Sequence, residues 1–406
     1  MKSILYCLLL LISTALRSQS DTQIIVGKAD HVYSKILNEN RQIWVHIPND
    51  YSPDGIFAKQ HYPVIYLLDG WEPNFSMVTA IVEQLSGGGG NLSFPKVIVV
   101  GLPNTDRTRD LTPTKTKMPP AGMDSMEASR SGGGENFIAF LEKELFPHID
   151  SLYPTAPYKI LIGHSLGGLM SLYILTDHTN LFNAYVAIDP STFWDNRIVL
   201  KQIKEKLQQK NLEKNSLFLA IANSMNSGID TSIIGPIMRC NFQLRDCLKA
   251  DKKSNLVFAV KYYDNYDHMS VPLPAEYDGL LFLFNFYNFN FPYMEFFNST
   301  YKSDTLLGEH YKMISRRMGY RVSPPEDFIN GIAYQLMNLN QLDRAYYFFA
   351  MNIENHPDSF NAYDSMGDLF VKKNEKKKAI EYYSRSLQLH ESTDTRQKLE
   401  KLRSGK

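Results

Sequence analysis

The chain has 406 residues, which is enough for two or three domains, and its 44% of hydrophobic and 21% of charged residues are typical of globular proteins with a sizeable core. Basic and acidic residues both number 43, and the formal net charge is +0. This balance argues against a nucleic acid or an anionic membrane surface as the partner.

The N-terminus, residues 1–20, has the pattern of a secretory signal peptide. Lys2 precedes an apolar run over residues 4–16, and small and polar residues follow it. The run is too short to span a bilayer comfortably. We therefore expect an exported protein, periplasmic or secreted after cleavage, with no transmembrane segment in the mature chain.

The cysteines indicate neither a disulfide nor a metal site. Cleavage would remove Cys7 and leave Cys240 and Cys247 on one predicted helix. Their Cα atoms would lie about 10 Å apart, beyond the reach of a disulfide. Without a Cys-x-x-Cys motif or a neighbouring histidine pair, we expect two free or buried thiols, no bound metal and no cofactor.

Residues 21–300 alternate strand and helix patterns, which predicts an α/β fold with a mostly parallel central sheet and helices on both faces. Two antiparallel entry strands are expected at 22–28 and 41–47. Further strands are expected at 62–68, 96–100, 158–162, 184–188, 216–222 and 255–262, and helices at 75–85, 136–152, 169–175, 198–212 and 233–248. Residues 102–134 have no period and are expected to form a long surface loop. The aromatic-rich stretch 272–297 is interrupted by asparagines, which favours a buried or interface helix over a membrane span.

The stretch 161–168 has the nucleophile-elbow pattern of α/β-hydrolases. Gly163, Ser165 and Gly167 form Gly-x-Ser-x-Gly between a strand pattern and a helix pattern, and Gly168 follows. The flanking positions must be small because the serine lies on a sharp, strained turn. We predict that Ser165 is a nucleophile; the alternative is a small-residue turn with an inert serine.

A serine hydroxyl needs a neighbouring base, and in this fold its partners follow in the order acid, then histidine. His268 lies six residues after the last predicted strand and is the predicted base, the alternative being a loop histidine that caps a helix. Asp230 is the only carboxylate in the loop after strand 216–222 and is the predicted acid, which would hold the imidazole in the correct tautomer. Asp264, Asp267, a helix-capping role for Asp230, and a Ser–His pair without a strong acid remain alternatives.

The oxyanion of an ester intermediate requires two backbone N–H donors. One is expected from Leu166, directly after the nucleophile. The other is expected from Gly70 or Trp71, because the loops after adjacent parallel strands leave the same edge of the sheet.

The last eighty or so residues change character and repeat with a period of 34. Ala345 and Ala379 are separated by this distance, as are Phe349 and Tyr383. Small residues where two helices touch, at a period of 34, are typical of tetratricopeptide repeats, which usually need three or more units to be stable alone. We therefore expect a linking helix at 306–318 within residues 301–323, and tetratricopeptide-like helices over 324–406 that pack on the preceding domain or on a protein partner. A plain helical hairpin tail is the alternative.

An ordered set of motifs resembles the putative-esterase family of α/β-hydrolases, which includes siderophore esterases, formylglutathione hydrolases and feruloyl-type esterases. The motifs are IYLLDG at 65–70, NTDRTRDLTP at 104–113, FIAFLEKELFP at 137–147, GHSLGG at 163–168, DPSTFWD at 189–195 and HMSVP at 268–272. The resemblance covers roughly residues 30–300.

By this resemblance, Ser165 and His268 are nucleophile and base, Leu166 and Trp71 are the oxyanion donors, and the loop carrying Trp194 lines the substrate pocket. Arg107 and Asp110 fit a substrate-facing loop, and the alternative is a structural ion pair that fixes that loop. The family often has Ser-Pro-Ser where this chain has Asp189-Pro190-Ser191, and the position of its acid varies.

The sequence therefore predicts an exported serine esterase that acts on a small-molecule ester through an acyl-enzyme. Two alternatives remain: a binding or adaptor protein that recruits a partner through its helical repeats, and an acyltransferase on the same scaffold. The identity of the ester does not follow from the sequence, because the loops 71–76, 102–134 and 191–197 set the shape of the pocket.

Overall fold

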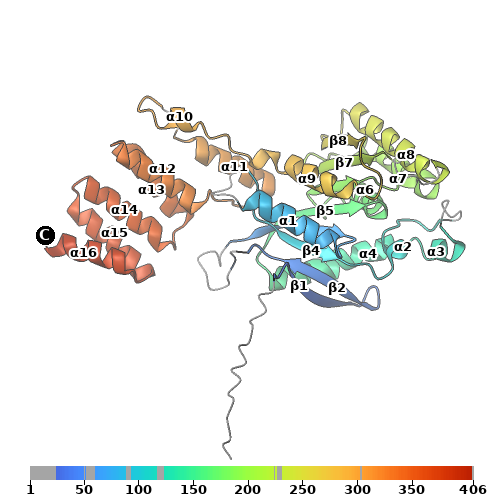
Figure 1. Cartoon of the computed structure of the whole chain (residues 1–406), viewed down its shortest axis with the longest axis horizontal. Coiled ribbons are helices and arrows are strands. Elements are labelled where there is room, and N and C mark those ends of the chain that lie inside the picture. The colour runs from blue at the N-terminus through green and yellow to red at the C-terminus, as the bar shows by residue number, and fades with distance from the viewer. Residues whose placement is uncertain are drawn as a thin grey trace, which may run out of the picture.

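The computed structural model describes residues 24–49, 51, 60–87, 93–116, 123–223, 225, 231–301 and 304–404. The predicted signal peptide lies outside these residues. The described part of the chain consists of a sheet domain followed by a stack of helices (Figure 1).

An eight-stranded sheet forms the centre of the sheet domain, in the order β1-β2-β4-β3-β5-β6-β7-β8. The strands are β1 (Lys28–Ser34), β2 (Glu39–His46), β3 (Tyr62–Leu68), β4 (Ile98–Leu102), β5 (Thr155–His164), β6 (Ala184–Ile188), β7 (Ser216–Ala222) and β8 (Val257–Tyr263). β1 and β2 pair antiparallel with each other, and β2 pairs antiparallel with β4. All other neighbours are parallel, so their carboxyl ends lie along one edge. The predicted α/β fold is confirmed.

The sheet is covered on both faces because its central strands are apolar on both sides. In β3, Ile65 and Leu67 belong to one apolar cluster, while Val64, Tyr66 and Leu68 belong to the other. The first cluster includes α1 (Asn74–Ser86) and α9 (Pro272–Leu283). The second includes residues of α4 (Gly134–Phe140), η1 (Leu141–Leu145), α5 (Phe146–Leu152), α6 (Leu166–Asp177), α7 (Trp194–Lys206) and α8 (Thr231–Ala250).

Several boundaries differ from those expected. The first entry strand begins at Lys28, where the one predicted over 22–28 ends, and it pairs with β2 through a tight turn in which Asn38 has φ 53°. The predicted helix 136–152 is three segments, with a π-helical turn in the middle. Residues 102–134 contain the short helices α2 (Arg107–Asp110) and α3 (Ser125–Ser129). The aromatic-rich stretch 272–297 is also divided, into α9, the turn η3 (Asn285–Tyr287) and α10 (Tyr293–Phe296).

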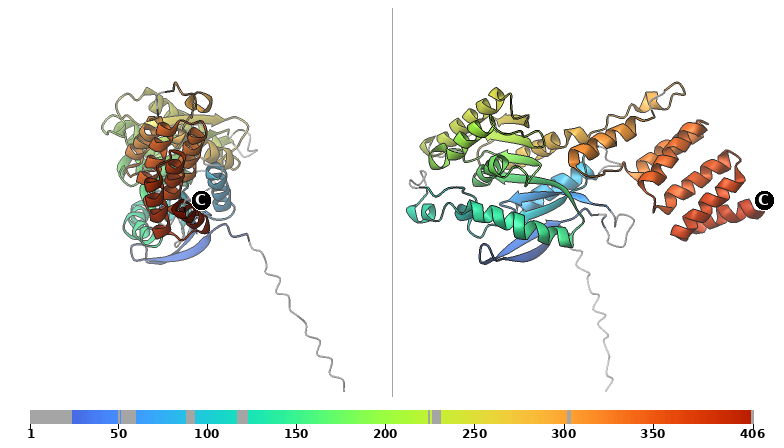
Figure 2. Two further views of the ribbon diagram at one scale, coloured as in Figure 1. Left: turned by 90° about the vertical axis from the view of Figure 1, so that its left-hand side faces the viewer. Right: turned by 180° about the vertical axis from the view of Figure 1, so that it is seen from behind.

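Five C-terminal helices of the described chain stack side by side at one end of the molecule (Figure 2). They are α12 (Glu326–Asn338), α13 (Leu342–Asn355), α14 (Phe360–Lys372), α15 (Lys376–Leu389) and α16 (Thr393–Ser404). The linking helix α11 (Leu306–Met318) lies between them and the sheet domain. α12 begins at 326 and α14 at 360, and α13 begins at 342 and α15 at 376, so each pair keeps the 34-residue period. A Cβ on Gly367 would lie 2.5 Å from the ring of Tyr383, which explains the small residue at this helix contact.

The helical stack shares its apolar core with one face of the sheet. The cluster that contains Ile65 and Leu67 continues through Leu307 in α11 to Leu399 in α16. The ring of Phe296 packs against Phe348 with centroids 5.5 Å apart, which joins α10 to α13. The two parts are therefore one continuously packed unit.

Cys240 and Cys247 are both free, as predicted. Within the described residues, none of the helices combines the length and apolar character needed to cross a membrane.

Candidate active site

Ser165 lies at a sharp turn between β5 and α6, with φ 60° and ψ −114°. A side chain at residue 163 could not be accommodated, because a Cβ there would lie 2.3 Å from the backbone oxygen of Gly167. This close approach returns the chain from the strand into the helix, and the strained φ of Ser165 is typical of a nucleophile elbow. The predicted strand–turn–helix context of the serine is confirmed.

His268 follows β8, and its imidazole is held by a buried carboxylate. The Nδ1 of His268 lies 2.6 Å from Oδ2 of Asp189, whose side chain is fully buried. Asp189 is the first residue after β6 and has φ 36°. An ionised carboxylate only accepts hydrogen bonds, so Nδ1 carries the proton and Nε2 is free to act as a base.

The other carboxylate oxygen of Asp189 is also satisfied. Its Oδ1 accepts hydrogen bonds from the backbone N–H of Ala222 at 3.1 Å and from Nδ2 of Asn241 at 3.0 Å. These donors compensate for the loss of water around the buried carboxylate. Asp189 therefore has the surroundings of a triad acid.

The acid predicted from the sequence is Asp230, not Asp189. Asp230 lies outside the described residues. Of its alternatives, Asp267 caps the turn that follows it, since Oδ1 accepts from the backbone N–H groups of Met269 and Ser270. In the described structure, the carboxylate bonded to the His268 ring is that of Asp189, which sequence reasoning missed. The available signal was an aspartate directly after β6, the strand that follows the elbow helix in the sequence.

The hydroxyl of Ser165 has a second serine beside it. Its Oγ lies 3.2 Å from Oγ of Ser191, and the backbone N–H of Ser191 donates to the Ser165 carbonyl at 3.0 Å. Among the described residues, no hydrogen bond joins this Oγ to the imidazole of His268. Such bonds are often long in unliganded enzymes and shorten when substrate binds.

The imidazole of His164 packs against that of His268, the predicted base, with ring centroids 4.4 Å apart. Burial, together with the adjacent His268, lowers the pKa of His164 to about 3. His164 is therefore neutral at physiological pH and presents no competing positive charge to His268.

Of the two predicted oxyanion donors, the backbone N–H of Leu166 has no hydrogen-bond partner among the described residues. Leu166 is the first residue of α6, where backbone N–H groups have no partner within the helix. The N–H of Trp71 instead donates to the carbonyl of Asp69 at 3.0 Å, and that of Gly70 donates to Leu102 at 3.1 Å. Trp71 thus reaches an oxyanion only if its N–H exchanges this local bond for the substrate oxygen.

Arg107 binds Asp69 rather than Asp110. Its Nε and Nη2 lie 2.7 and 2.9 Å from the two carboxylate oxygens of Asp69, and Nη2 also donates to the carbonyl of His164 at 3.3 Å. Asp110 is paired with Arg41 and Arg109. Arg107 therefore ties the loop of Trp71 to the elbow through an ion pair, and its predicted role in binding substrate stays a prediction.

Trp194, which the sequence predicts beside the substrate pocket, packs into the core of the sheet domain. Its side chain is fully buried, and its indole N–H donates to the carbonyl of Thr114 at 3.2 Å. The indole belongs to the apolar cluster on the α7 side of the sheet. Trp194 thus holds the backbone at Thr114, and its predicted contact with substrate stays a prediction.

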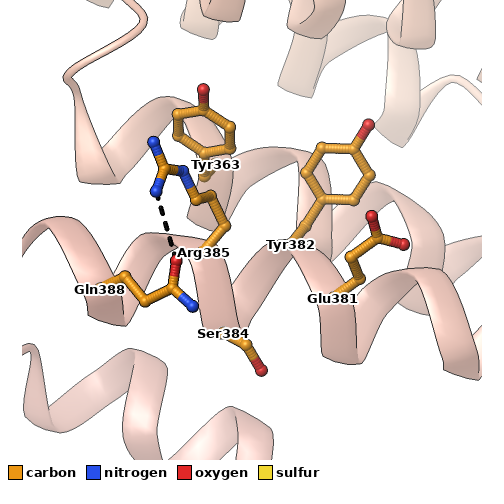
Figure 3. Close-up of a pocket in the computed structure, with 6 residues that line it drawn as sticks. All are labelled: Tyr363, Glu381, Tyr382, Ser384, Arg385 and Gln388. Carbon is orange, nitrogen blue, oxygen red and sulfur yellow. Dashed lines mark hydrogen bonds between the residues drawn. The ribbon is translucent and has the colours of Figure 1, made fainter.

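Elsewhere, a cavity of about 460 Å³ is lined by residues of α14 and α15 in the helical stack (Figure 3). Its lining residues are Tyr363, Glu381, Tyr382, Ser384, Arg385 and Gln388. Arg385 donates to Gln388 and lies over the Tyr363 ring, and the lining has no nucleophile–base pair. No cluster of metal-binding side chains occurs within the part of the chain that the structure describes.

Residues 34–234 match the putative esterase family, in agreement with the resemblance predicted from the sequence. The chain is 33% identical over 193 residues to the ferri-bacillibactin esterase of Bacillus subtilis, covering 45% of this chain and 66% of that one. It is 30% identical over 191 residues to a siderophore enterobactin esterase of Emericella nidulans, covering 44% and 60%. The chain thus spans a little under two thirds of the length of these curated relatives.

A solved structure extends the similarity. The IroE-like serine hydrolase of Shewanella oneidensis superposes with a TM-score of 0.68 and is 30% identical. The superposition covers 81% of this chain and 99% of that one.

Proposed function

Because the chain belongs to the putative esterase family, we propose that it is a serine esterase that hydrolyses a small-molecule carboxylic ester. The observation that carries the proposal is the buried Asp189 carboxylate bound to His268, at the same sheet edge as the Ser165 elbow. A serine, a histidine and an acid at this edge are the components of acyl transfer through a covalent intermediate.

In the proposed reaction, Nε2 of His268 takes the proton of the Ser165 hydroxyl as its Oγ attacks the ester carbonyl carbon. The oxyanion that forms receives the N–H of Leu166 and, after the local rearrangement described above, that of Trp71. His268 then donates its proton to the leaving alcohol, and an acyl-enzyme remains on Ser165. Water, deprotonated by His268, releases the acid and regenerates the serine.

Asp189 acts by holding His268, not by accepting its proton. The bond to Nδ1 selects the tautomer in which Nε2 is basic, and the carboxylate stabilises the imidazolium that forms during attack. We assign the acid to Asp189 in place of Asp230, on the strength of this contact.

Siderophore esters are the substrate class that we propose to test first. Two curated relatives carry the names of siderophore esterases, one for ferri-bacillibactin and one for enterobactin. Aryl, phenolic and acyl-sugar esters complete the comparison set, because the sequences of the loops that shape the pocket do not identify the ester.

We also propose that the protein is exported and that its C-terminal helices form a tetratricopeptide-like unit. Export rests on the signal-peptide pattern of residues 1–20. The repeat assignment is supported by the 34-residue period of the helices and by the Gly367–Tyr383 contact. Their continuous core with the sheet favours a structural role for these helices.

The test is turnover of p-nitrophenyl acetate and butyrate and of ferric siderophore esters by wild type, Ser165→Ala and His268→Ala. We expect turnover by wild type and a loss of at least about 10³-fold in either variant. If wild type hydrolyses none of these esters while remaining folded, the proposal fails, and binding through the helical stack becomes the better hypothesis.

A further inference from the structure

Asn241, in the middle of α8, makes contact with both ends of the segment 189–192. Its side chain is fully buried, like that of Thr192. Nδ2 of Asn241 donates to Oδ1 of Asp189 at 3.0 Å, and Oδ1 of Asn241 accepts from the Thr192 hydroxyl at 2.6 Å. Asn241, which is 52 residues from Asp189 in the sequence, is thereby hydrogen-bonded directly to the proposed acid.

The orientation of the Asn241 amide follows from its two partners. An ionised carboxylate can only accept, so the NH₂ group must face Asp189. The Thr192 hydroxyl can donate, and its proton is directed to the amide oxygen. A flipped amide would place its oxygen against the carboxylate, and two acceptors would meet without a proton between them.

These contacts determine which carboxylate oxygen faces the base. Oδ1 of Asp189 already receives two donors, from Ala222 and Asn241, which leaves Oδ2 for Nδ1 of His268. Without Asn241, only the peptide N–H of Ala222 would remain to hold Oδ1 of this carboxylate. In a buried site, a hydrogen bond to a charged group contributes more than one between neutral groups.

We infer that Asn241, oriented by Thr192, is a positioning residue that fixes the Asp189 carboxylate and, through it, the reactive tautomer of His268. This inference rests on the proposed esterase function. Asn241 touches neither substrate nor the reacting atoms, so its removal should lower kcat and leave KM nearly unchanged.

Two substitutions test the role. Asn241→Ala should lower kcat by about tenfold to a hundredfold, as loss of a bond to a buried charged group does. Asn241→Asp preserves the size of the side chain, and its neutral carboxyl can donate to Asp189 as the amide does. Once it ionises, the two carboxylates repel, so the activity of this variant should fall as pH rises through a range where wild type is constant.

The matched control is Asn215, another buried asparagine, whose Nδ2 donates to the carbonyls of Thr179 and Phe182. Asn215→Ala and Asn215→Asp should lower the stability of the fold, and their kcat should depend on pH as that of wild type does. If Asn241→Ala does not fold, Thr192→Val offers a milder change that frees the amide to rotate and should lower kcat by a few fold.

A readout that does not depend on turnover separates this inference from the esterase proposal. The Nδ1 proton of His268 in its short bond to Asp189 should give a low-field proton resonance, assigned by its loss in Asp189→Ala. In Asn241→Ala this resonance should shift or broaden, whether or not any ester is hydrolysed. An unchanged resonance, with kcat and pH profile equal to wild type in both Asn241 variants, would overturn the inference.

Discussion

Replacing Asp189 by asparagine should inactivate the protein by forcing the wrong histidine tautomer. The Oδ1 position of residue 189 receives N–H groups from Ala222 and Asn241, so the oxygen of a new amide must occupy it. The NH₂ group then takes the place of Oδ2, the oxygen that lies 2.6 Å from Nδ1 of His268 in wild type. Nδ1 can only accept from it, and the ring proton moves to Nε2, where the base is needed.

The expected loss in kcat for Asp189→Asn is about 10³- to 10⁴-fold, the scale on which a triad with the wrong tautomer is impaired. This corresponds to about 4 to 5.5 kcal/mol of transition-state stabilisation. KM should change little, because Asp189 is fully buried and cannot contact the substrate.

The assay is steady-state hydrolysis of p-nitrophenyl butyrate, with thermal unfolding to confirm that each variant is folded. Two matched variants serve as controls. Asp267→Asn removes a carboxylate next to His268 in sequence that binds turn N–H groups, and Asp230→Asn removes the acid expected from the sequence. Both should retain activity within about tenfold of wild type. Near-normal turnover by Asp189→Asn together with collapse in Asp230→Asn would refute the reasoning.

Three further predictions follow from the surroundings of the site. Arg107→Ala should lower kcat for neutral esters by loosening the Asp69–Gly70–Trp71 loop from the elbow; a rise in KM confined to anionic esters would instead indicate substrate binding by Arg107. Gly163→Ala should prevent folding or strongly lower the melting temperature, because its Cβ would lie 2.3 Å from a backbone oxygen. Gly331→Ala lies in the interior of α12 with nothing within 4 Å of the new Cβ, and it should stabilise the folded protein by up to about 1 kcal/mol. Comparable melting temperatures for the two variants would contradict this account of the elbow. The pKa of His164 is lowered to about 3 in the folded chain. As pH falls, the imidazole of His164 therefore gains a proton at a higher pH in the unfolded chain than in the folded chain. The free energy of unfolding should decline as pH falls from about 6.5 toward 3. Chemical denaturation at several pH values, with His164→Gln lacking this part of the slope, measures the effect.

Much of the fold follows from the sequence because the buried strands have a simple signature. β3, β6 and β7 begin and end at the predicted residues, since continuous apolar runs bounded by polar residues leave little choice of position. The first entry strand was misplaced because an edge hairpin with one exposed face has a weaker pattern, in which Val32 and Ser34 alone are buried. The π-helical turn at 141–145 has no distinct sequence signal.

The site was predictable where local geometry determines it. Gly163 and Ser165 define the elbow within a few residues, and the order rule leads to His268. The acid depends on which loop reaches the imidazole, a long-range property that sequence order does not determine. Asp189 and Asp230 both precede His268 and follow a strand, so the order rule alone does not separate them.

The sequence does not determine the roles of Arg107 and Trp194, for a related reason. A charged or aromatic residue in a motif near the site is compatible with substrate contact or with support of the loops. Only the bidentate contact with Asp69 and the full burial of the indole distinguish the two. Both residues hold loops at the sheet edge where Ser165 lies.

The central claim is that Ser165 is an activated nucleophile, and covalent labelling tests it most directly. Wild type is treated with a fluorophosphonate, and the modified peptide is identified by mass spectrometry. We expect a single adduct on Ser165, absent from Ser165→Ala and formed far more slowly in Asp189→Asn and His268→Ala. A folded wild type that forms no adduct, or an adduct on another residue that persists in Ser165→Ala, would contradict the account.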